Sequence, residues 1–278
     1  MSDASSSEAS NGGERIRVAV LGAAGRMGTT VCRAVLAADD MELVAAIDPP
    51  HEGEPLDAFG VTGTGLTIDM LGPSLKKKAD PQVAVDFTHM EAARGNLRWC
   101  GMNGVHAVVG TTGLTPSDLT DLSALFDGER ANAIVAPNFA IGAVLMMHLA
   151  AMAAPWFESA EIIELHHDAK RDAPSGTAML TAKRMAESSA EWNPDPTETY
   201  TLEDARGGEG PAGIRIHSVR LHGLVAHQEV LLGTTGQSLT IRHDSYDRTS
   251  FMPGVLLAIR EVGRRPGVTI GLDSLLGF

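Results

Sequence analysis

Short, uninterrupted apolar runs alternate with amphipathic segments over the first half of the chain. The runs lie at residues 17–22, 41–48, 83–88, 106–110 and 132–136. Each is typical of a strand that is buried on both faces. Helical patterns separate them at 29–38, 91–102 and 117–126, and the last follows a Thr-Pro-Ser start signal. Strands that alternate with helices predict a parallel, doubly wound sheet.

The pattern changes after residue 137. Predicted helices cover 141–157, 175–190 and 251–262, and predicted strands cover 160–165, 214–221, 225–232 and 238–243. A Gly-Thr-Thr-Gly sequence joins the last two strands and indicates a hairpin. Residues 57–78 have no readable pattern, and residues 191–213, rich in Pro, Glu and Gly, are expected to form a long loop. The fold class is therefore α/β: an N-terminal Rossmann-like doubly wound parallel sheet, and a second α+β domain carrying an open mixed sheet.

Charge and cysteine content narrow the function classes. The 278 residues include 22 Lys and Arg against 35 Asp and Glu, a net charge of −13. This argues against nucleic acid, which would need a basic patch, and against an anionic membrane surface. Two cysteines cannot build a disulfide framework or a zinc ribbon.

No targeting or membrane segment is evident in the sequence. The Ser-rich residues 1–14 lack the apolar run of a secretory signal and are expected to be a disordered tail. The longest apolar run, 141–157, contains His148 and Pro155 and is too short for a membrane span. We therefore expect a cytoplasmic protein.

A glycine-rich sequence, GAAGRMG at residues 22–28, lies between the first predicted strand and helix. Glycines there allow a tight turn and the close approach of a pyrophosphate, which the helix N-terminus attracts. Asp48 ends the second strand, twenty residues beyond Gly28, where an acid would bind ribose hydroxyls. Simple packing glycines and a solvated aspartate are the alternatives. Asp48 favours NADH, whereas Arg26 could pair with the extra phosphate of NADPH, so the cofactor is NADH or NADPH.

Two further segments follow buried strands. GTTG at residues 110–113 and APNF at 136–139 would lie at the carboxyl edge of the sheet, where ligands bind in such folds. Their backbone groups could hold the nicotinamide end of the cofactor. Ordinary turn chemistry is the alternative.

The most informative stretch is ELHHDAKRDAPSGTA at residues 164–178. His166 and His167 end a predicted strand, Lys170 follows, and Pro-Ser-Gly-Thr opens a helix whose N-terminus suits a carboxylate. Histidine titrates near neutrality and suits proton transfer. Taken singly, these residues would be a structural histidine, a surface lysine and, at Ser175, an N-cap. A metal site is not expected, because neighbouring residues on a strand point to opposite faces and no companion ligand is evident.

This stretch resembles the E-[LI]-H-H-x-x-K-x-D-x-P-S-G-T signature of the 4-hydroxy-tetrahydrodipicolinate (dihydrodipicolinate) reductase family. The resemblance extends over nearly the whole chain after the tail, through the motifs at residues 22–28, 86–88, 110–113, 136–139 and 224–230. The segments 240–245 and 250–254 are most similar to the actinobacterial branch. Two departures are Asp168-Ala169, where many relatives have a basic residue or histidine, and Pro49, where other branches have an arginine that favours NADPH.

The resemblance implies a role for each matching residue. The pyrophosphate would be held by Gly22, Ala23, Ala24, Gly25, Arg26 and Met27, the adenosine ribose by Asp48, and the nicotinamide end by Gly110, Thr111, Thr112, Ala136, Pro137, Asn138 and Phe139. His166 would be the proton donor and acceptor, Lys170 a proton donor, His167 a substrate contact, and Gly176 and Thr177 the carboxylate site.

The resemblance also implies the reaction: hydride transfer to C4 of a cyclic imine dicarboxylate, loss of the 4-hydroxyl as water, and protonation aided by His166 and Lys170. This is a step of lysine biosynthesis through diaminopimelate. We expect residues 15–137 with 252–278 to form the dinucleotide-binding domain and 138–251 the substrate-binding and oligomerisation domain. Closure of the two domains would exclude water. The resemblance implies a homotetramer. The second sheet has too few predicted helices to cover its apolar face, so association between subunits would cover it.

Two other functions are possible on the same scaffold. A semialdehyde dehydrogenase needs a nucleophilic cysteine, but Cys32 and Cys100 both lie on predicted helical stretches. A regulator that only senses NAD would have no use for His166, Lys170 and the carboxylate site together.

Overall fold

The computed structural model describes residues 14–111, 115–189 and 191–278. The predicted tail up to residue 13 and the predicted cofactor residue Thr112 lie outside the described residues. Contacts within the chain divide it into two compact units. One holds the chain up to Ile134 together with Val262–Thr269, and the other holds Val135–Glu261 together with Ile270–Phe278. The domain boundaries expected from sequence stay a prediction, because compactness does not say what each unit binds.

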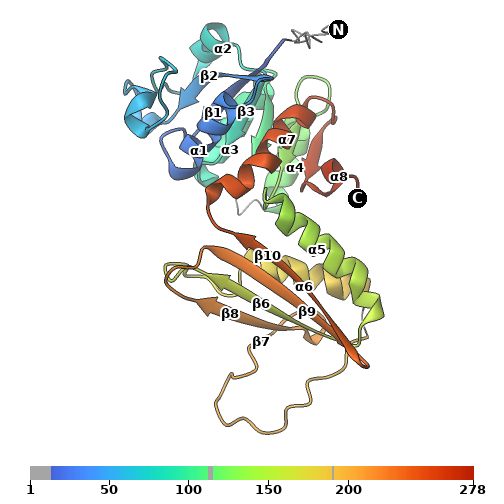
Figure 1. Cartoon of the computed structure of the whole chain (residues 1–278). Helices are drawn as coiled ribbons and strands as arrows, with labels where there is room; N and C mark the ends of the chain where they lie inside the picture. The colour runs from blue at the N-terminus through green and yellow to red at the C-terminus, as the bar shows by residue number, and fades with distance from the viewer. Residues whose placement is uncertain (1–13, 112–114, 190) are drawn as a thin grey trace, which may run out of the picture. The chain divides into compact units, whose positions relative to one another are not determined.

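A six-stranded sheet with strand order β11-β5-β4-β3-β1-β2 organises the first unit (Figure 1). Its strands are β1 (Ile16–Leu21), β2 (Met41–Ile47), β3 (Val83–Asp86), β4 (His106–Val109), β5 (Ala133–Val135) and β11 (Val268–Ile270). β1 pairs in parallel with both β2 and β3, and β3 pairs in parallel with β4. The chain thus moves outward from β1 in both directions, which confirms the doubly wound prediction.

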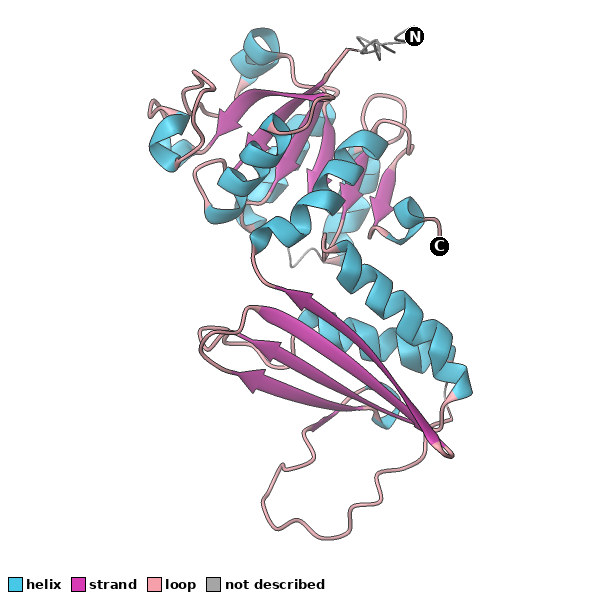
Figure 2. Cartoon of the chain, in the orientation of Figure 1, coloured by secondary structure: helices cyan, strands magenta, loops and turns pink. Residues whose placement is uncertain are grey.

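Helices flank this sheet (Figure 2). They are α1 (Arg26–Leu36), α2 (Pro73–Ala79), α3 (Met90–Met102) and α4 (Pro116–Leu125). The sequence shows no polar alternation in β1 because Val18, Ala19 and Val20 are fully buried. The N-terminus of α4 is closed by a reciprocal pair in which Thr115 and Asp118 each accept from the other's backbone.

The second unit has a five-stranded sheet with order β10-β9-β6-β8-β7. The strands are β6 (Ser159–His166), β7 (Gly208–Glu209), β8 (Arg215–Arg220), β9 (Ala226–Thr234) and β10 (Gln237–Ser245). β6 runs parallel to β8 and antiparallel to β9, and β9 and β10 form the predicted hairpin. The expected open mixed sheet is therefore confirmed.

Two long helices pack on one face of this second sheet. α5 (Ile141–Ala153) contacts β10, and α6 (Gly176–Ser188) contacts β6 and α5. Alternate strand residues, among them Ile162 and Val230, are fully buried on this face. The unit also includes most of α7 (Met252–Val262) and the short α8 (Asp273–Leu276).

Some sequence-based boundaries were wrong. The helix predicted to end at 157 ends at Ala153 and continues as a 3₁₀ turn, because Pro155 has no amide hydrogen to donate. The stretch that showed no pattern contains α2, whose first residue, Pro73, favours a helix start. The long loop contains the two-residue strand β7.

Candidate cofactor- and substrate-binding sites

The glycine-rich loop joins β1 to α1 in a tight turn, in which the loop backbone packs closely against the start of the helix. Gly22 has φ +77°, in the left-handed region, and a Cβ added at Gly28 would lie 1.9 Å from the Gly22 carbonyl oxygen. Gly25, at the N-cap of α1, offers no side chain to the first amides of the helix. Those amides and the exposed backbone at Gly25 and Arg26 form a cradle that fits a pyrophosphate.

Asp48 lies next to this loop, as the spacing predicted. Its Oδ2 accepts a hydrogen bond from the Ala24 backbone nitrogen at 3.0 Å. The carboxylate is therefore fixed at the end of β2 beside the loop, where it can bind ribose hydroxyls. Arg26, two residues after Ala24, is exposed to solvent. The residues of the first unit thus fit a dinucleotide.

A buried aspartate, Asp86, connects the ends of β3 and β4 through hydrogen bonds. Asp86 ends β3, is 1% exposed, and accepts hydrogen bonds from Thr88 Oγ1 at 2.6 Å, Asn96 Nδ2 at 2.8 Å and Thr111 Oγ1 at 3.3 Å. Gly110 packs directly against Phe87, since an added Cβ would lie 2.1 Å from its ring and the ring would have to shift. Gly110 and Thr111 are thereby placed at the carboxyl edge of the sheet.

The segment Ala136–Phe139 belongs to the second unit. Asn138 Oδ1 accepts from the Ala140 backbone nitrogen at 2.8 Å, and Asn138 Nδ2 donates to Thr177 Oγ1 at 3.4 Å. Ala136 and Phe139 are buried, whereas Pro137 is exposed. Within its unit this segment therefore contacts the start of α6, and its role toward the cofactor stays a prediction.

His166 is the last residue of β6, and its ring is held by a buried acid. Its Nδ1 lies 2.5 Å from Glu164 Oε2, and the Glu164 side chain has no exposed surface. Arg220, from the neighbouring β8, donates to both carboxylate oxygens at 2.8 and 2.9 Å. The Ser175 backbone nitrogen donates to Glu164 Oε1 at 3.2 Å. The histidine, two strands and the start of α6 thus meet at one carboxylate.

Burial and hydrogen bonding act in opposite directions on the pKa values of Glu164 and His166. Burial by itself would raise the pKa of Glu164, but hydrogen bonds from Arg220, Ser218 and His166 outweigh it and hold the pKa below its usual value. Burial lowers the pKa of His166, and the charges of Lys170 and Arg220 lower it further against the opposing pull of Glu164. Burial and the positive neighbours therefore favour the uncharged imidazole.

Lys170 and the start of α6 lie on the same short stretch of chain. Lys170 Nζ donates to both oxygens of Asp172 at 2.9 and 2.8 Å, and the Lys170 side chain is 21% exposed. Ser175 Oγ accepts from the Ala178 nitrogen at 3.2 Å, which confirms the N-cap reading. A Cβ added at Gly176 would meet nothing within 4 Å, so the helix start is open to a ligand.

A small cavity of about 50 Å³ lies beside these groups in the second unit. His166, Thr177, Gln228 and His243 are among the residues that line it. Gln228 donates to Thr181 at 2.8 Å, but its buried Oε1 has no partner in the described chain. His167, by contrast, is exposed.

Sequence reasoning did not single out Glu164, Arg220 or Asp172, which form the hydrogen-bond network behind His166 and Lys170. Glu164 could have been found, since an acid at an inward position of an otherwise apolar strand must have a partner. Arg220 is 56 residues from Glu164 in sequence, and only the pairing of β6 with β8 brings them together.

Neither cysteine is suited to act as a nucleophile. Burial raises the pKa of Cys32 to about 12 and also raises the pKa of Cys100. In the described parts of the chain, no three His, Cys, Asp or Glu side chains gather in a way that could hold a metal ion. No helix among the described residues is long and apolar enough to cross a membrane.

Comparison with known proteins gives a consistent result. The family models for the N-terminus and the C-terminus of dihydrodipicolinate reductase match residues 16–139 and 142–276. A 4-hydroxy-tetrahydrodipicolinate reductase of Nocardia farcinica is 51% identical over 266 residues, which are 94% of this chain and 98% of that protein. The enzyme of that name from Mycobacterium ulcerans is 51% identical over 265 residues, 95% of this chain and 100% of that protein. Both are actinobacterial relatives, as the later segments of the sequence indicated.

Solved structures agree. The dipicolinate-bound dihydrodipicolinate reductase from Paenisporosarcina sp. TG-14 has a TM-score of 0.83 and 42% identity, and the match covers 94% of this chain and 99% of that chain. An amine dehydrogenase from Mycobacterium smegmatis has a TM-score of 0.63 at 15% identity, which shows a shared fold alone. Since the two family models together span nearly all of the described sequence, this chain belongs to the dihydrodipicolinate reductase family.

Proposed function

We propose that this chain reduces 4-hydroxy-tetrahydrodipicolinate to tetrahydrodipicolinate with NADH or NADPH and releases water, a step of lysine biosynthesis through diaminopimelate. The observation that carries the proposal is the cluster at the end of β6. There a histidine on a buried carboxylate, a lysine and an open helix N-terminus occupy one stretch of chain. A relative whose structure was solved with dipicolinate supports a ligand of this class.

The start of α6 is suited to a dicarboxylate. The amides at Gly176 and Thr177 and the Thr177 hydroxyl can donate to one carboxylate, and the positive end of the helix dipole favours it. Lys170, now bound to Asp172, adds a positive charge on a flexible stem that could turn toward the substrate. Such local positive groups are needed because the chain as a whole carries a net charge of −13.

The conversion consumes one hydride and one proton and releases one water. The glycine-rich loop and Asp48 would hold the nicotinamide cofactor, whose chemistry is to supply a hydride for C4, while the 4-hydroxyl would leave with a C3 hydrogen as water. Lys170 holds a proton that it can donate as C3 is protonated. His166 keeps its Nδ1 hydrogen toward Glu164, so its other ring nitrogen can accept a proton and return it. His167 is assigned to substrate contact.

Asp48 provides a test of cofactor choice. Replacing Asp48 with asparagine is expected to raise KM for NADH about 10-fold, because ribose hydroxyls lose a charge-assisted acceptor. The amide oxygen can still accept from Ala24, so the loop should keep its shape. The KM for NADPH should rise less, since the repulsion of its 2′-phosphate is also removed. Equal changes for both cofactors, measured by initial rates, would argue against contact with the ribose.

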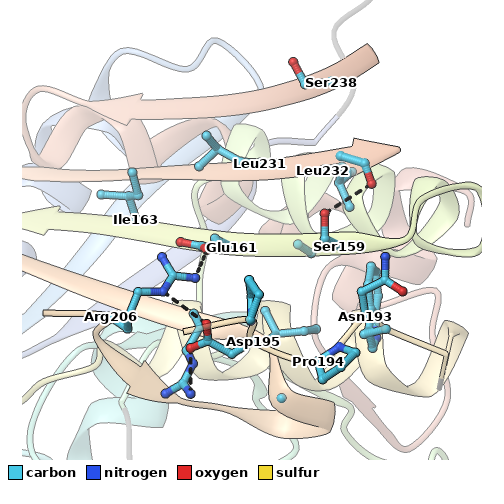
Figure 3. Close-up of a pocket in the computed structure, with 17 residues that line it drawn as sticks. Ser159, Glu161, Ile163, Asn193, Pro194, Asp195, Arg206, Leu231, Leu232 and Ser238 are labelled. Atoms are coloured by element: carbon cyan, nitrogen blue, oxygen red, sulfur yellow. Dashed lines mark hydrogen bonds and ion pairs between the residues drawn. The ribbon is translucent and has the colours of Figure 1, made fainter. Parts of the chain in front are cut away.

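The face of the second sheet that carries no α-helix in the described chain supports an oligomer. The face opposite α5 and α6 carries Ile163 on β6 and Leu231 on β9, between charged residues such as Glu161. Figure 3 shows these side chains at a cavity of about 630 Å³, with Asn193 and Asp195 beside it. We expect this face to associate with other copies of the chain as a cytoplasmic homotetramer. Light scattering should then give about four times the chain mass of 29.2 kDa, and a monomer at assay concentration would contradict it.

The decisive assay uses freshly prepared 4-hydroxy-tetrahydrodipicolinate with either NADH or NADPH. Oxidation of at least one cofactor should depend on both the substrate and the chain. Dipicolinate should inhibit it in competition with the substrate. If neither cofactor is oxidised by the folded protein, the proposed reaction is wrong.

A further inference from the structure

We propose that Glu164 and Arg220 are positioning residues, which hold His166 with its hydrogen on Nδ1 and fix the Lys170 loop to the same strand pair. This inference rests on the proposed function, since it concerns how the proposed proton-transfer groups are held. Neither residue is among those whose role the family signature implies here.

Glu164 is the centre of the arrangement. Its carboxylate has no exposed surface, yet donors from three elements reach it: His166 on β6, Arg220 on β8 and the Ser175 amide at the start of α6. A buried carboxylate surrounded by donors stays ionised and can only accept. The Glu164 oxygen at 2.5 Å from Nδ1 therefore requires the hydrogen of neutral His166 to lie on Nδ1. The Nε2 lone pair is left free to accept a proton.

Arg220 has two tasks in this geometry. It binds Glu164 through both terminal nitrogens, which a planar guanidinium does better than an ammonium. Its Nη2 also donates to the Asp172 carbonyl oxygen at 2.6 Å. The side chain of Asp172 in turn holds Lys170. A single arginine thus links the buried acid behind His166 to the loop that carries the lysine.

The charged groups that face His166 come from several elements. Glu164 lies on its own strand, Arg220 on β8 and Lys170 on the following loop, and each changes the electrostatic environment of the ring. His227 and His243, on β9 and β10, line the same cavity, and His227 is paired with Asp244 at 2.7 Å. Since Arg220 cancels the charge of Glu164, His166 faces a nearly neutral pair plus the Lys170 cation.

Removing Glu164 and removing Arg220 should therefore shift the pKa of His166 in opposite directions. In Glu164→Gln the ring loses its counter-charge, so its pKa should fall, and the amide no longer dictates which nitrogen carries the hydrogen. In Arg220→Gln the carboxylate is left uncompensated, so the pKa of His166 should rise. Variants that only destabilised the fold would not shift the pKa of His166 in opposite directions.

The test is a pH titration of ¹⁵N-labelled histidine rings by NMR, with the His166 signal assigned from a His166→Gln sample. Wild type should show the Nδ1–H form, Glu164→Gln a mixture of forms, and the two variants opposite pKa changes. Arg220→Lys, which keeps the charge, should stay near wild type in pKa. Glu161→Gln is the matched control, because Glu161 on the same strand pairs with Arg206 and His217 on the opposite face. It should leave the His166 signal unchanged.

Kinetics complete the test. Glu164→Gln should lower kcat about 100-fold with a smaller change in KM, as expected when a general acid or base loses its orientation. An Nε2–H form in wild type, or an unchanged His166 titration in both Glu164→Gln and Arg220→Gln, would overturn the proposal. The NMR result does not depend on turnover, so failure of the proposed reaction would be seen separately in the assay.

Discussion

Replacing Lys170 with alanine is expected to lower turnover about 100- to 10,000-fold, the range typical for loss of a positioned general acid. Lys170 is the cation of the cluster at the end of β6, and it is paired with Asp172, whose side chain is 65% exposed. The same change should raise KM for the dicarboxylate, because a positive charge near the open start of α6 is lost.

Binding of NADH should be unchanged in this variant, since Lys170 lies outside the glycine-rich loop and its neighbours. Fluorescence titration with NADH and initial rates with the substrate measure the two effects separately. Lys183→Ala is the control: Lys183 lies on α6 with a 67% exposed side chain, far along the helix from its start, and should behave as wild type. Near-normal turnover of Lys170→Ala would contradict its assigned role.

Replacing Gly28 with alanine is expected to weaken NADH and NADPH binding at least about 100-fold, the larger end of effects from displaced binding groups. The added Cβ would lie 1.9 Å from the Gly22 carbonyl oxygen and 2.8 Å from the Ala23 Cα, both backbone atoms. The helix start must therefore move away from the loop, and the cradle for the pyrophosphate is lost.

A second glycine gives the control for this change. Gly95 lies within α3, and a Cβ added there would meet nothing within 4 Å. Gly95→Ala should bind cofactor normally and should gain about 0.5–1 kcal/mol in stability, because alanine favours a helix more than glycine does. Calorimetric titration and thermal unfolding compare the two variants. Unchanged affinity in Gly28→Ala would show that the loop does not hold the cofactor.

The sequence predicted the first sheet well because its signals are local. Apolar runs such as that of β1 are buried on both faces, and the spacing from Gly28 to Asp48 reflects one helix, α1, followed by one strand, β2. The hydrogen bond between Asp48 and Ala24 follows from that topology. The hairpin of β9 and β10 was likewise recognisable from its turn residues.

Features set by long-range contacts could not be predicted in the same way. β11 has three residues and is a strand because it pairs at a sheet edge, which its own sequence does not indicate. The role proposed for Arg220 was also not predictable, because only the parallel pairing of β6 with β8 brings it to Glu164, 56 residues away in sequence. Glu164 was visible within the signature, but its burial and its donors from three elements are properties of the fold.

The most direct test of the account is a crystal structure of the protein with dipicolinate. We predict that one carboxylate of the ligand will lie at the amides of Gly176 and Thr177, with Lys170 turned toward the ligand and the His166 ring at its edge. Dipicolinate bound elsewhere, for instance against Arg206 and Arg215 in the cavity of Figure 3, with the start of α6 left empty, would contradict the assignment.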